Sequence, residues 1–160
     1  MRCARRERFG TRLVQISVQS NHVHLIVETE SRDALSRAMQ GLSGRVAYRL
    51  NKRLRRRGPA FADRYHSRAL KTPLEVKRAL VYVLQNHRHH AEGVDRSLDR
   101  SLDRSLDQSL HRAQLDALSS APYFDGFTVR VRPAPKDAPV VPARTWLLRI
   151  GWAARPDSTG

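Results

Sequence analysis

The chain has a single cysteine, Cys3, among its 160 residues. One thiol excludes an internal disulfide and a zinc site built from several cysteines. No run of apolar residues approaches the roughly 18 that cross a bilayer. The charged start MRCARRERFG also lacks the apolar stretch of a signal peptide. We therefore expect a cytoplasmic protein that does not associate with membranes.

Acidic residues are scarce relative to basic ones. The chain has 30 Lys and Arg against 15 Asp and Glu, a formal net charge of +15. Residues 1–90 carry 20 of these basic residues and 6 of the acidic ones, whereas residues 91–160 carry 10 and 9. A concentrated field of one sign attracts polyanions, so the composition favours a nucleic-acid partner. A generally basic surface that reflects Arg-rich codon usage is the alternative.

Two strands are predicted near the N-terminus. Residues 11–19, TRLVQISVQ, alternate between two faces, and residues 22–28, HVHLIVE, follow the turn residues Ser20 and Asn21. We expect these strands to pair as a hairpin. Alternation then places one set of side chains of the second strand on a common face: His22, His24, Ile26 and Glu28.

Two helices are predicted after the hairpin. The first begins after the capping residue Ser31 and is stopped by Gly58 and Pro59. Residues 60–70 read as a third strand or an extended segment. The second helix starts at TPLE, residues 72–75, where Thr72 and Glu75 form a capping box and a proline takes the first helical position. It runs to about residue 90.

The pattern changes after Gly93. Residues 95–110 repeat a tetrapeptide, DRSL, which predicts a low-complexity insert that forms an amphipathic helix or a loose solvated one. The Pro-rich stretch after it predicts an irregular surface segment, and TWLLRIGW, residues 145–152, predicts an apolar patch that docks on the domain or binds DNA. We expect a catalytic domain, a repeat insert or helix, and a Pro-rich C-terminal tail over residues 1–93, 94–120 and 121–160.

The His-x-His pair, His22 and His24, is a candidate metal site. Side chains two residues apart on a strand point the same way, so two imidazoles can hold one divalent ion. Two imidazoles alone make an incomplete site, and a third protein ligand is needed. The alternative is a half-exposed strand that carries two ordinary histidines.

Tyr82 and Asn86 favour a catalytic role for the site around the His-x-His pair. They lie four residues apart on the second predicted helix and so share a face. A tyrosine hydroxyl can attack a phosphodiester that a metal polarises, while an amide oxygen can join the metal's ligands. The alternative for Tyr82 is a core aromatic, because Val81 and Leu84 give this helix an apolar face.

The order and spacing of these motifs resemble a known family. VQSNHVHLIVE, then LSRAMQGLSGRVAYRLNKRLRRRGPAFADRYHSRAL and TPLEVKRALVYVLQNHRHH, are similar to the HUH-type single-strand DNA transposases, and most to the group of REP-associated tyrosine transposases. The resemblance covers residues 11–93. It implies an α+β, ferredoxin-like sandwich with an antiparallel sheet and the helices on one face.

The resemblance also implies roles for individual residues. His22 and His24 match the metal ligands, Tyr82 matches the nucleophile, and Asn86 stands where the family places a polar metal ligand. The implied activity is Mg²⁺- or Mn²⁺-dependent transposition, in which single-stranded DNA with hairpin or palindromic repeats is cut and joined through a 5′-phosphotyrosine. The enzyme is expected to be a monomer or a homodimer. The family's N-terminal strand has no counterpart before residue 11, which is expected to leave one sheet edge unpaired.

Basic side chains along the chain are candidate phosphate contacts, and each is otherwise part of a solvated basic face. They are Arg45, Arg49, Lys52, Arg53, Arg55, Arg56, Arg57, Arg64 and Arg68. Three aromatic residues, Tyr48, Phe61 and Tyr65, are candidates for stacking on bases, although Phe61 equally suits a core position. The alternative to an enzyme is a non-catalytic or degenerate nucleic-acid-binding protein on the same scaffold, and an unfolded product of a truncated gene is the third possibility.

Overall fold

A computed structural model describes residues 9–91, 118–124 and 138–153, except for the side chains of residues 85–91. The elements are β1 (Thr11–Val18), β2 (Val23–Thr29), α1 (Arg32–Leu54), α2 (Pro73–Ala91), η2 (Ala121–Tyr123), α4 (Trp146–Arg149) and η4 (Gly151–Ala153). The fold is therefore α+β, as predicted. None of the helices in these ranges combines the length and the apolar character that spanning a membrane requires.

Strands β1 and β2 form the predicted antiparallel hairpin. Ser20 and Asn21 make its tip, and the Gln19 N–H donates to the carbonyl of His22 at 2.9 Å to close the turn. The register places Ser17 opposite His24. A bulge between Leu13 and Gln15 shifts the alternation of β1.

Both predicted helix starts are present. The Ser31 hydroxyl accepts a hydrogen bond from the Ala34 N–H at 3.0 Å, which satisfies one of the free donors at the start of α1. At the start of α2 the Thr72 hydroxyl accepts from the Glu75 N–H, and the Glu75 carboxylate accepts from the Thr72 N–H, both at 3.2 Å. This reciprocal pair is the capping box that the TPLE sequence predicts.

Helix α1 ends earlier than Gly58 and Pro59 predict. Its last residue is Leu54, and Arg55 adopts the left-handed conformation with φ of 50°. The Arg56 N–H and the Asn51 amide hold the following turn, donating to the carbonyls of Asn51 and Gly58 at 3.0 and 2.7 Å. These bonds replace the last helical turn, so the arginines after Leu54 project from a loop.

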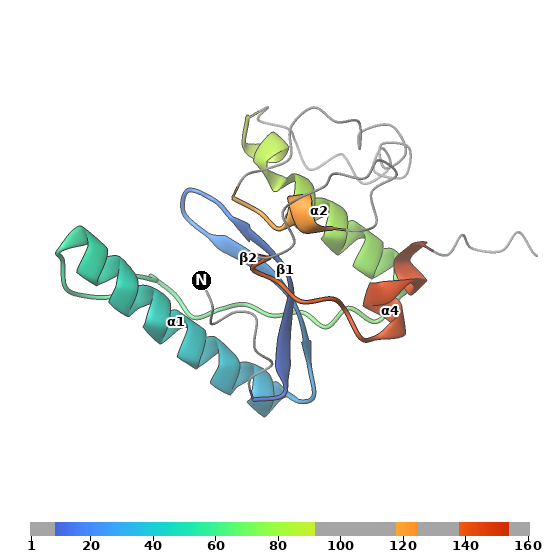
Figure 1. Cartoon of the computed structure of the whole chain (residues 1–160), viewed down its shortest axis with the longest axis horizontal. Helices are drawn as coiled ribbons and strands as arrows, with labels where there is room; N and C mark the ends of the chain where they lie inside the picture. Colours follow the sequence, from blue (N-terminus) through green and yellow to red (C-terminus); the bar gives the residue numbers. More distant parts are fainter. Residues whose placement is uncertain (1–8, 92–117, 125–137, 154–160) are drawn as a thin grey trace, which may run out of the picture.

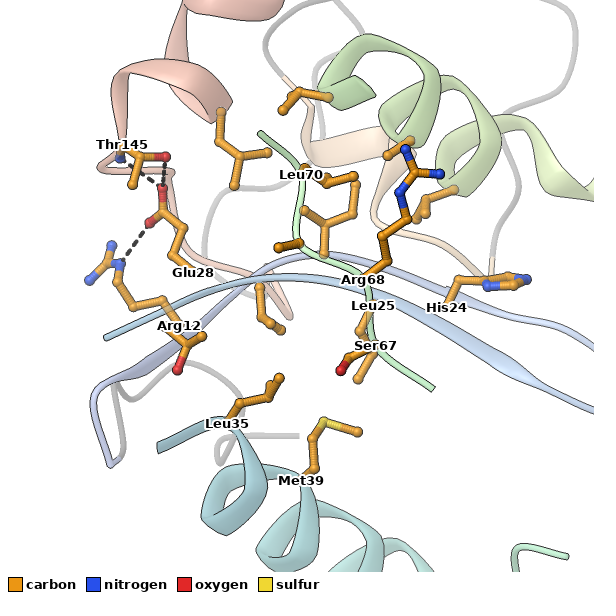
Figure 2. Close-up of a pocket in the computed structure, with 18 of the residues that line it drawn as sticks. Arg12, His24, Leu25, Glu28, Leu35, Met39, Ser67, Arg68, Leu70 and Thr145 are labelled. Carbon is orange, nitrogen blue, oxygen red and sulfur yellow. Dashed lines mark hydrogen bonds and ion pairs between the residues drawn. The ribbon is translucent and has the colours of Figure 1, made fainter. Parts of the chain in front are cut away.

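The core forms between α2 and one face of the hairpin. It contains Ile26 of β2, a set of α2 residues and Ala121 of η2; the α2 residues are Val76, Leu80, Val83 and Leu84. Helix α1 lies on the opposite side of the hairpin, where Leu35 and Met39 point toward the strands (Figures 1 and 2). The prediction that the helices share one face of the sheet is therefore wrong for these elements. The described residues form a two-stranded sheet with a helix on each side, and this arrangement is not a complete ferredoxin-like sandwich.

The C-terminal segments cover the outer edge of β1. The Val18 N–H donates to the Leu118 carbonyl at 2.9 Å, and the Val141 N–H donates to the Leu13 carbonyl at 3.0 Å. Between these contacts the Ser120 hydroxyl bonds to the Gln15 side chain at 2.5 Å.

Ser17, Ser120 and Ala121 are fully buried there. The prediction of an irregular surface segment is therefore wrong for residues 119–121, which are buried, because polar residues of β1 need these partners once they are buried. The apolar patch over residues 145–152 docks on the domain, since its residues Leu147, Leu148 and Trp152 pack against the core.

The outer edge of β2 is different. Within the described ranges β2 pairs with β1 alone. Beyond its free edge lies a groove of about 1080 Å³, with residues 65–70 among its walls (Figure 2). That segment has no regular secondary structure in the described chain, so of the two predicted possibilities for residues 60–70, a third strand or an extended segment, the strand is not formed.

Candidate active site

Three side chains that the sequence singles out lie together at the turn end of the hairpin. The ring centroids of His22 and His24 are 4.6 Å apart, with an angle of 75° between the ring planes. The ring of Tyr82 packs edge-on against His24, with centroids 4.9 Å apart and an interplanar angle of 77°. Residues 60 positions apart in the chain therefore form one aromatic and imidazole cluster.

The fold explains this meeting. His24 lies on the same face of β2 as Ile26, and Ile26 packs against α2. On α2 the neighbours of Tyr82, Val81 and Val83, are 5% exposed, whereas Tyr82 is 47% exposed. Tyr82 therefore lies at the border of the buried face of the helix, where its ring reaches His24 and part of its side chain meets solvent. The alternative of Tyr82 as a core aromatic is wrong.

The donor set suits a divalent cation in part. His22 lies in the turn directly before β2 and His24 lies on the strand. Two neighbouring imidazoles are the ligand type that transition metals accept, and they leave coordination positions for water or phosphate oxygens. Among the described residues no third His, Cys, Asp or Glu completes a metal-binding group. Asn86 lies on α2 one turn after Tyr82. Its side chain is outside the described part of the structure, so its predicted role as a ligand stays a prediction.

Asn21 belongs to the same cluster, and the sequence interpretation treated it only as a turn residue. Its Oδ1 lies 2.5 Å from Nδ1 of His22. The available signal was its place directly before the His-x-His pair, at the tip of a tight hairpin. A short polar side chain at that position can reach the ring of the next residue.

Glu28 shares the strand face of His24 and Ile26, but it is used for structure. Its carboxylate accepts hydrogen bonds from the backbone N–H groups of Arg144 and Thr145 and from the Thr145 hydroxyl, at 2.7–2.9 Å. Arg12 lies 3.5 Å away on the paired strand (Figure 2). Burial raises the pKa of Glu28, but the bonds from Thr145 and Arg144 and the charge of Arg12 outweigh it and lower this pKa overall.

The candidate phosphate contacts fall into two groups. The larger group lies on the C-terminal half of α1 and on the loop after it. Arg45 of this group is half-buried, and the other six members are exposed: Arg49, Lys52, Arg53, Arg55, Arg56 and Arg57. Arg64 and Arg68 lie on the segment between the helices and are also exposed. Arg68 forms an ion pair with Glu75 at 2.5 Å. Its guanidinium is thus partly committed to the start of α2.

The start of α2 carries a perturbed carboxyl group. Hydrogen bonds from the Lys71 backbone N–H, the Arg68 side chain and the Thr72 N–H lower the pKa of Glu75 to about 2. This carboxylate therefore stays ionised across the physiological range. It is a capping group and is not a candidate acid or base.

The aromatic candidates for base stacking are all solvent-accessible. Tyr48 is 67% exposed, Phe61 42% and Tyr65 38%. Phe61 therefore does not occupy a core position. Tyr65 also lines the groove beside β2, together with His24 and Tyr82.

Comparison with known proteins gives one match. The family model described as "Transposase IS200 like" matches residues 3–86, which is more than half of the 160-residue chain. No curated protein and no solved structure matches. The matched residues include the hairpin, α1 and the part of α2 that carries Tyr82. The chain therefore belongs to the IS200-like transposase family, the HUH-type group of tyrosine transposases that its motifs resemble.

Proposed function

We propose that the protein is a metal-dependent transposase that cuts and joins single-stranded DNA through a 5′-phosphotyrosine. The observation that carries this proposal is the contact between His24 and Tyr82 at 4.9 Å, with Tyr82 half exposed. A nucleophile for DNA must lie beside the group that polarises the phosphate, and it must also be accessible to a large substrate. Tyr82 meets both conditions.

The proposed reaction conserves the phosphodiester bond. The phenol oxygen of Tyr82 attacks the scissile phosphorus, the bond to the 3′ oxygen breaks, and the departing strand leaves with a 3′-hydroxyl group. The proton of the phenol passes to solvent or to a basic group at the site. A 3′-hydroxyl of another DNA end then attacks the phosphotyrosine, which restores a phosphodiester and releases the tyrosine.

His22 and His24, with Asn86 as a proposed third ligand, would hold Mg²⁺ or Mn²⁺. The bound ion would supply polarisation of the phosphate and neutralisation of developing charge. Imidazole and amide side chains suit these ions less than carboxylates do, which agrees with a weakly held ion that substrate phosphate helps to bind. The substrate proposed from the family resemblance is DNA that carries hairpin or palindromic repeats.

The basic residues would position the DNA backbone. The C-terminal half of α1 and the loop after it present six exposed Lys and Arg side chains at one end of the molecule. Contacts from such side chains to phosphates add affinity and orientation but no sequence information. The proposed DNA path therefore runs between this basic end and the cluster around Tyr82.

The test is covalent trapping of DNA. A hairpin-bearing single-stranded oligonucleotide is incubated with the protein and Mg²⁺ or Mn²⁺, and adducts are separated by denaturing electrophoresis. We expect an adduct with the parent protein and none with Tyr82→Phe, while Tyr48→Phe serves as a control at an exposed tyrosine on α1. An adduct that persists in Tyr82→Phe would show that the nucleophile is another residue.

A non-catalytic DNA-binding protein is the alternative that this experiment separates. It would bind the oligonucleotide in a salt-sensitive manner and give no adduct with either metal. Circular dichroism and a thermal melt of each variant establish that the proteins compared are folded.

A further inference from the structure

Asn21 occupies a fixed position at the hairpin tip. Residues 19–22 connect the strands, and Ser20 and Asn21 form the two-residue tip of this turn, because the Gln19 N–H bonds to the carbonyl of His22 at 2.9 Å. The Gln19 side chain is also held, since its amide donates to the Ser17 hydroxyl at 2.6 Å. The backbone on either side of the tip is thus held by the bond between Gln19 and His22. The exposed side chain of Asn21 lies against the ring of the next residue.

The contact that results is specific to one ring nitrogen. Oδ1 of Asn21 lies 2.5 Å from Nδ1 of His22. An amide oxygen can only accept a hydrogen bond, so Nδ1 of a neutral His22 must carry the proton. The lone pair of that imidazole is then on Nε2. Metal-ligating histidines commonly donate their other ring N–H to an oxygen in this way, which fixes both the tautomer and the ring orientation.

We propose that Asn21 is a positioning residue that holds His22 in its Nδ1–H tautomer and so presents Nε2 to the divalent ion. This inference rests on the proposed function, because it assigns Asn21 a role toward the metal of that site. Asn21 itself does not bind the metal in this proposal. Its amide acts through the imidazole, and the turn supplies the rigidity that makes the orientation reproducible.

The first experiment measures Mn²⁺ binding by the folded, DNA-free protein with titration calorimetry. Removal of an outer hydrogen-bond partner of a ligating histidine weakens metal affinity by about 10–100-fold in known sites. We expect a loss in this range for Asn21→Ala, and near-parental affinity for Asn21→Asp, whose carboxylate also accepts from Nδ1. Ser20→Ala, in the same two-residue loop, is the control and should leave the affinity unchanged.

The second experiment reads the tautomer directly, without metal or DNA. Long-range ¹H–¹⁵N correlation spectra, recorded above about pH 7.5 where an ordinary imidazole is neutral, distinguish the Nδ1–H and Nε2–H forms. We expect His22 of the parent protein to be in the Nδ1–H form. Asn21→Ala should shift it toward the Nε2–H form that free imidazole side chains prefer.

The outcomes separate this inference from the proposed function. Equal Mn²⁺ affinity of Asn21→Ala and the parent, or an Nε2–H tautomer of His22 in the parent, would overturn the role of Asn21 while leaving the phosphotyrosine chemistry intact. The second result would mean that the amide is reversed and donates to Nδ1. Absence of an adduct with a parent protein that binds Mn²⁺ would overturn the proposed function instead, and the affinities would still decide the role of Asn21.

Discussion

The two long helices have similar apolar spacing in the sequence but very different surroundings in the structure. Helix α2 buries five apolar side chains: Val76, Leu80, Val81, Val83 and Leu84. Helix α1 is longer, at 23 residues, yet its only buried residue is Ala34. Val46 and Leu50, which continue its apolar spacing, are each 38% exposed. The C-terminal half of α1 extends away from the hairpin (Figure 1).

This difference separates two requirements of the proposed chemistry. A nucleophile must be held to within a fraction of an ångström, and Tyr82 is carried by the helix that the core immobilises. Contacts to phosphates depend on positive charge and side-chain length more than on exact placement, and most of the proposed ones lie on α1 and the loop after it, where the core makes few contacts. The pair of helices thus divides the molecule into a rigid half that carries the proposed nucleophile and an exposed basic half.

The largest expected difference between the helices is in stability. Leu80→Ala removes a core side chain that is 3% exposed and should lower the free energy of unfolding by about 2–5 kcal/mol. The same substitution in α1, Leu50→Ala, should change it by no more than about 0.5 kcal/mol. Urea denaturation of both variants measures these values. Equal losses would show that α1 is packed in solution against something that covers Leu50.

Glu28→Gln tests the anchor that holds residues 144 and 145 on the α2 side of the hairpin. The change removes a charge that accepts three hydrogen bonds from Arg144 and Thr145, so we expect a loss of about 1–3 kcal/mol at neutral pH. Thermal denaturation over a range of pH measures it.

The pH dependence has a defined sign. The pKa of Glu28 is lowered in the folded protein, so its contribution is present above the ordinary value of 4.5 and is lost as the pH falls through the folded-state pKa. The difference between parent and Glu28→Gln should therefore shrink on acidification below about pH 4.5. A difference that is constant with pH would show that the carboxylate charge is not what holds the segment.

The two helix caps should have smaller and unequal effects. Thr72→Ala and Ser31→Ala each remove one N-cap hydrogen bond, which is worth about 1 kcal/mol in typical helices. Because α2 belongs to the core, we expect the loss at Thr72 to appear as a lower melting temperature of the whole domain. The loss at Ser31 should appear mainly as faster amide exchange within α1. A melting temperature that responds only to Ser31→Ala would reverse the assignment of the rigid half.

The smallest effect on stability is expected on the exposed face of α1. Replacement of Arg49, Lys52 and Arg53 together by Gln should change the free energy of unfolding by about 0.5 kcal/mol or less. If all three contact phosphates, the slope of log affinity against log salt for single-stranded DNA should fall by about 2. Arg78→Gln, at an exposed position on α2, is the control. An unchanged slope in the triple variant would remove α1 from the DNA path.

Local features were predictable because they depend on neighbours in the chain. The hairpin follows from alternation around Ser20 and Asn21, and the two helix starts follow from the capping residues Ser31 and Thr72. The contact between His24 and Tyr82 could also be predicted from the sequence, because strand alternation and helical spacing each restrict the direction in which a side chain points. The family resemblance then supplied which of these side chains to compare.

Features that depend on distant segments were not predictable in the same way. The alternation of β1 does not reveal that Gln15 and Ser17 are buried, because Gln15 bonds to Ser120, 105 positions along the chain, and Ser17 forms a bridge with Ser119, 102 positions along. The apolar stripe of α1 is the reverse case, since its spacing suggests burial but Val46 and Leu50 are each 38% exposed. Helical spacing shows which residues share a face, but it does not show whether another element packs on that face. The side of the sheet on which α1 lies is likewise a matter of tertiary packing.

The covered edge of β1 has a consequence for how the protein is made. Residues 118–120 and 141 bond to a strand that leaves the ribosome more than 90 residues before them. Contacts of such long sequence separation form late and slow folding. The outer edge of the hairpin is therefore covered only after residue 141 has been synthesised, so a nascent chain that already carries His22, His24 and Tyr82 still lacks this cover. Synthesis order alone would delay the proposed DNA-cutting activity until residues far beyond the proposed nucleophile have been added.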